Sequence, residues 1–149
     1  MTRINVGIHP KYLVDQHLIA EIKEIPQLLG QLTRSLACGT ATNLPTRFTL
    51  GKGHVKFFYN KLSYLDNRFN VLREEANKRG FNVNASIDLS AYPSWCKNDY
   101  VEQPVDEFIL IDRISSKLKS KPNFYRYNKK QNIPTFIKTY YLLHKNNTL

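Results

Sequence analysis

A reactive amine and a nearby carboxylate are the first chemistry that the sequence suggests. Thr2 is a small residue between Met1 and Arg3, and the carboxylates of Glu21 and Glu24 follow in the first predicted helix. An α-amine has a pKa of about 7.7–8.0, against about 10.4 for lysine, so much more of it is neutral and nucleophilic at physiological pH. If Met1 is removed, we expect Thr2 to present an amine nucleophile.

Helical spacing predicts how the polar residues of this first helix are arranged. His17, Glu21 and Glu24 lie at positions i, i+4 and i+7, which form one side of a helix, while apolar residues occupy another side. Lys23 and Gln27, also four residues apart, flank that side. The spacing therefore predicts a groove with acidic residues at its centre and cations on its walls.

Each of these features also has an ordinary structural interpretation. Carboxylates on a helix face are most often solvated, and His17 would serve equally well as a hydrogen-bonding partner. The Gly51-Lys52-Gly53 stretch has neither the third glycine of a dinucleotide motif nor the ending of a Walker motif, so we expect it only to lead into a helix. The four histidines are scattered without metal-ligand spacing, and the sequence predicts no metal site.

Positive charge is concentrated near the C-terminal end. The 149-residue chain has a formal net charge of +10, and residues 113–149 hold nine lysines and arginines and no carboxylate. Phe124, Tyr125 and Tyr127 lie among these cations. Cations interleaved with aromatic rings favour a polyanion with bases that stack, which indicates nucleic acid. A basic segment that is only solvated, or that attracts lipid, is the alternative.

Length and composition predict one domain. A chain of this length with 42% apolar residues can bury one modest core. We expect a soluble, cytoplasmic protein, because no apolar run resembles a signal peptide or approaches the ~20 residues of a membrane span. In that compartment Cys38 and Cys96 are expected to be reduced thiols.

Apolar periodicity predicts three main helices. The first covers residues 15–37, where Pro26 predicts either a kink or a division into two shorter helices. The second covers residues 54–79 and ends at Gly80, because glycine readily adopts the left-handed conformation that closes a helix. The third covers residues 104–119 and begins with a proline, which is favoured in the first turn.

The rest of the chain predicts loops. Residues 38–53 and 81–103 are rich in Asn, Ser, Thr, Gly and Pro and contain no convincing strand. The residues after Pro134 predict either a short amphipathic helix or a frayed tail.

Five segments of the chain resemble, in order, the pyrimidine dimer DNA glycosylases of the T-even phage endonuclease V family. They are MTRINVGI, DQHLIAEIKEIPQLLG, GKGHVKFFYNKLSYL, KRGFN and RISSKLKSKPNFYRY. The resemblance covers residues 1–134 and implies one compact all-α domain, in which the N-terminus lies against the first helix. Residues 135–149 are then a C-terminal extension.

The resemblance also implies roles for individual residues. It implies that Thr2 supplies the attacking α-amine and that Glu24 is the catalytic carboxylate. Enzymes of this family act on cyclobutane pyrimidine dimers in duplex DNA, bend the duplex and flip out a base opposite the lesion. We therefore expect a monomeric DNA repair glycosylase with AP-lyase activity that uses no metal or cofactor and does not act at a membrane. The expected DNA-binding residues are Arg3, Gln16, His17, Lys23, Gln27, Arg113, Lys117, Tyr125 and Arg126.

Four positions depart from the family pattern. Lys23 and Gln27 each stand where the family has arginine, Phe124 stands in place of a tryptophan, and Arg126 in place of a lysine. An amide at position 27 lacks the charged, fork-shaped grip of a guanidinium. A glycosylase and AP lyase for a different DNA lesion is therefore one alternative, and a non-catalytic basic DNA-binding protein with the same fold is another.

Overall fold

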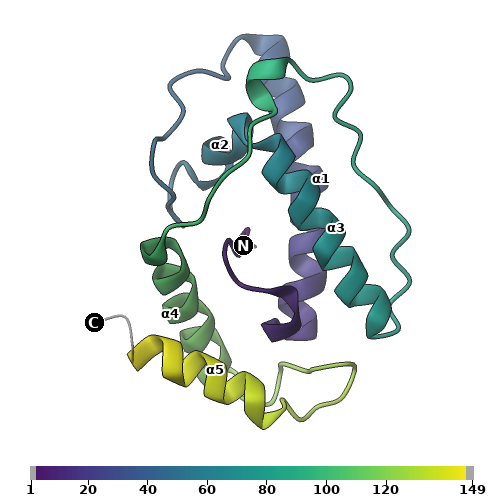
Figure 1. Cartoon of the computed structure of the whole chain (residues 1–149), viewed down its shortest axis with the longest axis vertical. Coiled ribbons are helices and arrows are strands. Elements are labelled where there is room, and N and C mark those ends of the chain that lie inside the picture. The colour runs from purple at the N-terminus through teal and green to yellow at the C-terminus, as the bar shows by residue number, and fades with distance from the viewer. Residues whose placement is uncertain (1–2, 147–149) are drawn as a thin grey trace.

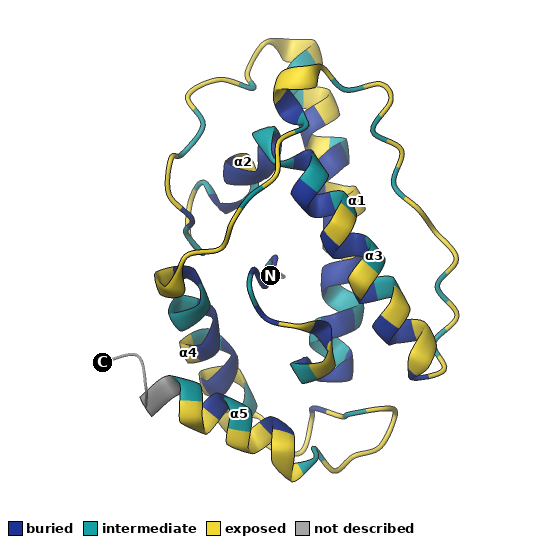
Figure 2. Ribbon diagram, viewed as in Figure 1, coloured by how far each residue is buried: buried dark blue, intermediate teal, exposed yellow. Residues whose placement is uncertain are grey.

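Two long helices form the middle of the molecule. The computed structural model describes residues 3–146, together with the side chains of residues 3–144. Helix α1 (Asp15–Cys38) and helix α3 (Leu62–Lys78) pack against each other and run in opposite directions (Figure 1). Their buried sides face the interior, as Figure 2 shows, and carry the apolar residues that the sequence periodicity places on one side of each helix.

Helix α1 closely matches its prediction of 15–37. It is one helix rather than two, although Pro26 lies within it. Ile22, Ile25 and Leu29, on both sides of the proline, are buried in the same core, while Pro26 itself is exposed. Packing therefore compensates for the hydrogen bond that proline removes. Gly39, with φ of 70°, ends the helix.

The predicted second helix is divided in the structure, so the prediction of one continuous helix over 54–79 is wrong. Helix α2 (His54–Phe57) passes into the 3-10 turn η2 (Phe58–Asn60), and α3 begins only after Lys61. The consecutive residues Phe57, Phe58 and Tyr59 are all buried. A regular helix with one buried side cannot bury three successive aromatic residues, and the tighter turn allows it.

Helix α4 (Pro104–Ser120) begins with proline, as predicted. The side chains of Gln103 and Asp106 form a capping box at its start, with the Gln103 N–H donating to Asp106 Oδ2 over 3.0 Å. The bounds of α4 agree with the sequence prediction to within one residue. Gly80, which follows the C-terminal end of α3, has φ of 89°, in agreement with its predicted role as a helix stop.

Residues 135–146 form helix α5 (Thr135–Asn146), the first of the two outcomes expected for this region. It packs against α4, as Figure 1 shows. The Tyr140 ring stacks on Tyr12 at 3.8 Å between centroids, and the Tyr141 hydroxyl donates to the Tyr12 carbonyl over 2.6 Å. Tyr12 belongs to the 3-10 turn η1 (Pro10–Tyr12), so α5 also contacts the segment before α1.

Long irregular segments connect the helices. Residues 39–53 link α1 to α2, and residues 79–103 link α3 to α4 with the short 3-10 turn η3 (Ser94–Cys96) within them. Residues 3–146 contain no strand, so the predicted all-α class is confirmed. No helix in this part of the chain has the length and apolar character needed to span a bilayer.

Candidate active site

The first described residues lie between α1 and the segment that leads into α2. The Asn5 side chain donates to Glu21 Oε1 over 2.7 Å, and the Ile4 N–H donates to His54 Nε2 over 3.0 Å. The Arg3 Nε–H donates to the Leu50 carbonyl over 2.7 Å. Consecutive residues of the N-terminal segment are thus held by partners from different elements.

Thr2, the predicted nucleophile, lies outside the described residues. It directly precedes Arg3 in the sequence. The anchors on Arg3 and Ile4 therefore hold the two residues that follow the predicted nucleophile.

Glu21 is not part of an exposed acidic face. Its side chain is fully buried, and Arg68 of α3 binds it through two hydrogen bonds, from Nε to Oε2 at 2.7 Å and from Nη2 to Oε1 at 3.0 Å. Arg68 Nη1 also donates to the Ile8 carbonyl over 2.6 Å. The expectation that Glu21 lies beside Glu24 at the centre of a groove is wrong, because a buried carboxylate needs a partner and Arg68 supplies it from the interior.

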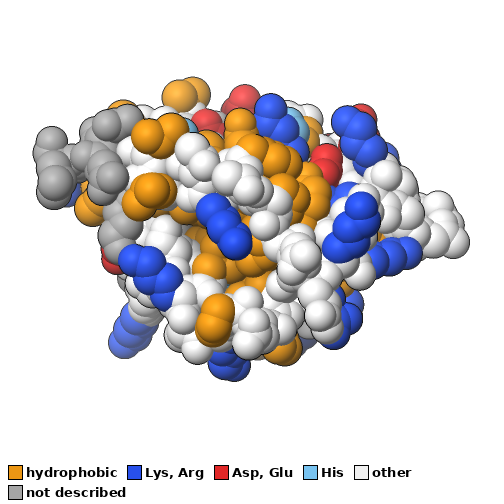
Figure 3. Space-filling model, turned by 90° about the horizontal axis from the view of Figure 1, so that it is seen from below, with side chains coloured by type: hydrophobic (Ala, Val, Ile, Leu, Met, Phe, Trp, Pro, Cys, Tyr) orange, Lys and Arg blue, Asp and Glu red, His pale blue; other side chains and the backbone are white. Residues whose placement is uncertain are grey.

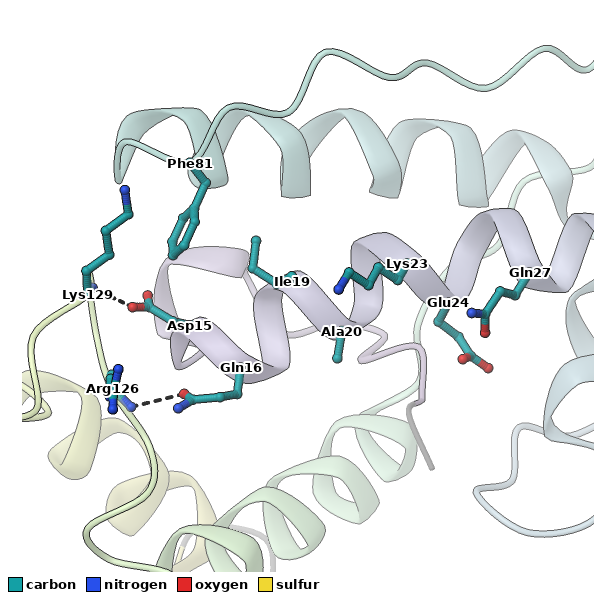
Figure 4. Close-up of a pocket in the computed structure, with 10 residues that line it drawn as sticks. All are labelled: Asp15, Gln16, Ile19, Ala20, Lys23, Glu24, Gln27, Phe81, Arg126 and Lys129. Carbon is teal, nitrogen blue, oxygen red and sulfur yellow. Dashed lines mark hydrogen bonds between the residues drawn. The ribbon is translucent and has the colours of Figure 1, made fainter.

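Glu24 lies half-buried in a hollow that follows α1. Gln16, Ala20 and Glu24 project to the same side of the helix, as their four-residue spacing requires (Figure 4). Burial raises the pKa of Glu24 above its ordinary value, and the nearby positive charge of Arg3 opposes this. We call this hollow the α1 groove; its lining consists of Asp15, Gln16, Ile19, Ala20, Lys23, Glu24, Gln27, Phe81, Arg126 and Lys129.

The α1 groove partly matches the predicted arrangement of charge. Lys23 and Gln27 are exposed along one wall, and Arg126 and Lys129 come from the segment after α4. Ile19 and Phe81 add an apolar surface. The groove therefore combines one accessible acid with cationic walls.

A second, positively charged hollow adjoins the groove, since Gln16 and Ala20 line both. Its volume is about 200 Å³, and the side chains of Arg3, Arg113 and Lys117 give its lining a positive charge that favours an anionic group. We call it the cationic pocket; its lining consists of Arg3, Asn5, Gln16, His17, Ala20, Arg113, Lys117, Phe124 and Tyr125.

His17 is neutral at physiological pH in this pocket. Burial is the main cause that lowers the pKa of His17 to about 4, and the positive charges of Arg113 and Lys117 lower it further. Its ring lies 4.9 Å from the Tyr125 ring, and among the described residues its buried Nδ1 has no hydrogen-bond partner. Burial, together with the charge of Arg3, also lowers the pKa of Arg113, as expected where cations gather.

Gln16 holds a neighbouring backbone segment. Its Nε2 donates to the Phe124 carbonyl over 2.7 Å, and its Oε1 accepts from the Arg126 N–H over 3.0 Å. Both ends of the amide are therefore used to fix residues 124–126 against α1. This contact places Tyr125 beside His17 and Arg126 in the groove that Glu24 also lines, although these residues are far apart in the sequence.

A buried cluster of ion pairs, which the sequence did not predict, holds the continuation of this segment at residues 128–129. Arg79 donates through Nη1 to Asp15 Oδ1 at 2.9 Å and through Nε to Glu75 Oε1 at 2.9 Å. Asp15 accepts the backbone N–H groups of Asn128 and Lys129. We call Arg79, Asp15 and Glu75 the Arg79 junction. A charged residue at a predicted helix end was the only signal for it, and such residues are usually exposed.

Positive charge is also concentrated on one face of the molecule. Lysine and arginine side chains surround an apolar centre on the face seen in Figure 3, where acidic side chains are few. A clustered positive surface attracts polyanions over distances beyond direct contact. An acid with a raised pKa beside an anchored N-terminal segment, next to a cationic pocket, is suited to proton transfer on a substrate that carries negative charge.

Comparison with known protein families identifies the family of this chain. The family model described as pyrimidine dimer DNA glycosylase matches residues 1–89. The matched part is more than half of the chain, and it includes the N-terminal segment, α1 with Glu24, and α3 with Arg68. The resemblance found in the sequence is confirmed over these residues, and the chain belongs to the pyrimidine dimer DNA glycosylase family.

Proposed function

We propose that this DNA glycosylase also cleaves the DNA strand, with the α-amine of Thr2 as nucleophile and Glu24 as general base. The observation that best supports the proposal is the position of Glu24. It is half-buried in a groove, its pKa is raised by burial, and Arg3 of the N-terminal segment is close enough to affect that pKa. A base with a raised pKa is better matched to proton abstraction near neutral pH.

The chemistry begins with the neutral amine. It attacks C1′ of the damaged nucleotide, a C–N bond forms, and the glycosidic bond breaks with its electron pair leaving on the base. Opening of the sugar ring then gives a protonated imine. Glu24 helps to offset the positive charge that develops at C1′.

Strand cleavage follows from the same imine. The imine cation acidifies the C2′ hydrogen, which Glu24 removes as a proton. The C2′–H electron pair becomes a double bond between C2′ and C3′ while the C3′–O bond breaks, and the 3′ phosphate leaves. One site thus accounts for both base release and β-elimination.

The basic residues around the site are proposed to bind the phosphates of damaged duplex DNA. Arg113 and Lys117 lie one helical turn apart on α4, and both line the cationic pocket together with Arg3. Lys23 and Arg126 line the neighbouring groove. Lysine and arginine contacts to phosphate release condensed counterions, which makes binding dependent on salt.

Replacing Arg113 or Lys117 with alanine is expected to weaken DNA binding and to reduce its salt dependence. Each lost phosphate contact should lower the magnitude of the slope of log affinity against log salt by about 0.9. Fluorescence anisotropy with dimer-containing duplex at several salt concentrations measures that slope. Arg73→Ala is the control, because Arg73 lies on α3 outside both hollows and donates to the Ala85 carbonyl. An unchanged slope in both α4 variants would place Arg113 and Lys117 outside the interface.

Borohydride trapping tests the proposed function as a whole. Borohydride reduces an imine to a stable amine, so dimer-containing duplex should yield a covalent protein–DNA adduct through residue 2. Mass spectrometry should show that Met1 has been removed before the reaction. An adduct only with abasic DNA, or with another lesion, would support the alternative substrate suggested by Gln27. Absence of any adduct would reject the amine mechanism.

A further inference from the structure

His54 contacts the N-terminal segment directly and has no part in the mechanism proposed above. Its side chain is 2% exposed, at the first position of α2. The rings of Phe48 and Phe58 meet it edge-on, with centroids 5.5 and 5.3 Å away. The apolar packing fixes the plane of the imidazole, so only its two nitrogens remain for polar contacts.

Both nitrogens of His54 are used, and their partners determine the tautomer. Nδ1 lies 2.7 Å from the Thr49 carbonyl, which can only accept, so Nδ1 carries the proton. Nε2 is then unprotonated and accepts the Ile4 N–H at 3.0 Å. Burial lowers the pKa of His54 to about 4, although the hydrogen bond to Thr49 acts in the opposite direction and raises it. The ring is therefore neutral at physiological pH, the form that this pair of contacts requires.

The segment that carries His54 is itself held in one conformation. Gly53 has φ of 95°, and a Cβ added there would lie 3.0 Å from Cγ of Pro45. The Gly51 N–H donates to the Thr49 hydroxyl over 3.2 Å. Leu50 of the same segment accepts from Arg3. The Gly51-Lys52-Gly53 stretch therefore does more than lead into a helix, because it places acceptors for both Arg3 and Ile4.

We propose that His54 is a positioning residue for the amine step, holding the Ile4 amide so that the α-amine of residue 2 meets the sugar beside Glu24. The inference depends on the proposed amine chemistry. Once Arg3 and Ile4 are anchored, only a few backbone torsion angles between the amine and the anchored Arg3 remain free to rotate. Fixing these residues before the reaction reduces the conformational entropy that the step must lose, and a misplacement of about 1 Å can reduce a rate by about a hundredfold.

Two substitutions allow the two hydrogen bonds of His54 to be tested one at a time, because each variant retains only one of them. In His54→Gln, the side-chain Oε1 can reach the position of Nε2 and accept the Ile4 N–H. In His54→Asn, the side-chain amide can reach the position of Nδ1 and donate to Thr49, but it cannot reach Ile4. Both variants replace a neutral ring with a neutral amide, so each serves as the control for the other.

The readout is the rate of borohydride trapping on dimer-containing duplex at saturating enzyme, measured beside DNA affinity and thermal midpoint. His54→Asn is expected to lower the trapping rate by about tenfold, the equivalent of one lost hydrogen bond, with DNA affinity unchanged. His54→Gln should retain most of the rate. Equal trapping rates in His54→Asn and the unsubstituted protein would overturn the proposal. So would an equal loss of trapping rate in both variants that parallels an equal fall in their thermal midpoints, because general destabilisation would then explain it.

Gly53→Ala gives a second test if His54→Asn does not fold. The added Cβ must push the segment away from Pro45, which moves the acceptors for Arg3 and Ile4 together. The expected result is again slower trapping at saturating enzyme, where a change in affinity caused by the shift of Arg3 does not limit the rate. A normal trapping rate in the folded variant would contradict the proposal. Failure of the unsubstituted protein to form any adduct is a different result, since it would reject the amine mechanism itself.

Discussion

Glu24→Gln is expected to bind dimer-containing DNA but to lose strand cleavage by a factor of about 10²–10⁴, the usual contribution of a general base. Glutamine preserves the size of the side chain but cannot take the C2′ proton. It also cannot offset the positive charge at C1′, so imine formation should slow as well. Single-turnover cleavage of a labelled duplex measures the loss, and anisotropy measures the retained binding.

The same experiment has a pH signature. Since burial raises the pKa of Glu24, cleavage should decline on acidification at a higher pH than an ordinary glutamate would give, because the protonated carboxyl cannot act as a base. Glu74→Gln is the matched control, because Glu74 is exposed on α3 and lines neither hollow. Full cleavage by Glu24→Gln would remove Glu24 from the proposed mechanism.

Arg68→Met is expected to lower the free energy of unfolding by about 3–5 kcal/mol, the usual cost of leaving one member of a buried ion pair without its partner. The substitution removes two hydrogen bonds to Glu21 and one to the Ile8 carbonyl. Asn5 alone would then face the buried carboxylate. The loss is large relative to the ~5–15 kcal/mol stability of ordinary domains. Urea denaturation followed by circular dichroism measures it.

A double-variant cycle identifies the origin of this loss. Combining Arg68→Met with Glu21→Met removes both charges, and the double variant should recover part of the stability lost in Arg68→Met. Arg73→Met is the control on the same helix, because Arg73 makes a single hydrogen bond to an exposed loop and should change stability by less than about 1 kcal/mol. A similar loss in both arginine variants would count against the buried pair as the cause.

The sequence predicted the helices whose boundaries depend on local signals. Helix α4 begins at a proline with a capping box, and Gly39 and Gly80 end α1 and α3 with positive φ. The break at residues 58–61 was not predictable from periodicity, because Phe58 and Leu62 both fall on the expected buried line. Only the additional burial of Phe57 and Tyr59 requires the break, and burial depends on the packing of distant segments.

The sequence predicted the positions of those candidate site residues that are brought together by their spacing on a single helix. Arg113 and Lys117 lie on one side of α4 as their spacing requires, and the structure brings them beside His17 and Tyr125. The burial of Glu21 was not predictable, since its partner Arg68 is 47 residues away. The contact between Ile4 and His54 has the same origin, because it joins residues 50 apart through a backbone N–H that no side-chain pattern reveals.

The Arg79 junction has a consequence for the energetics of recognition. Through Asp15 it holds the backbone at Asn128 and Lys129, just after the proposed DNA-facing residues Tyr125 and Arg126. Ordering the backbone of one residue costs about 1–2 kcal/mol in entropy. Since this loop is already ordered when the protein folds, the proposed DNA-binding surface is preorganised, and binding should cost little further conformational entropy in this part of the chain.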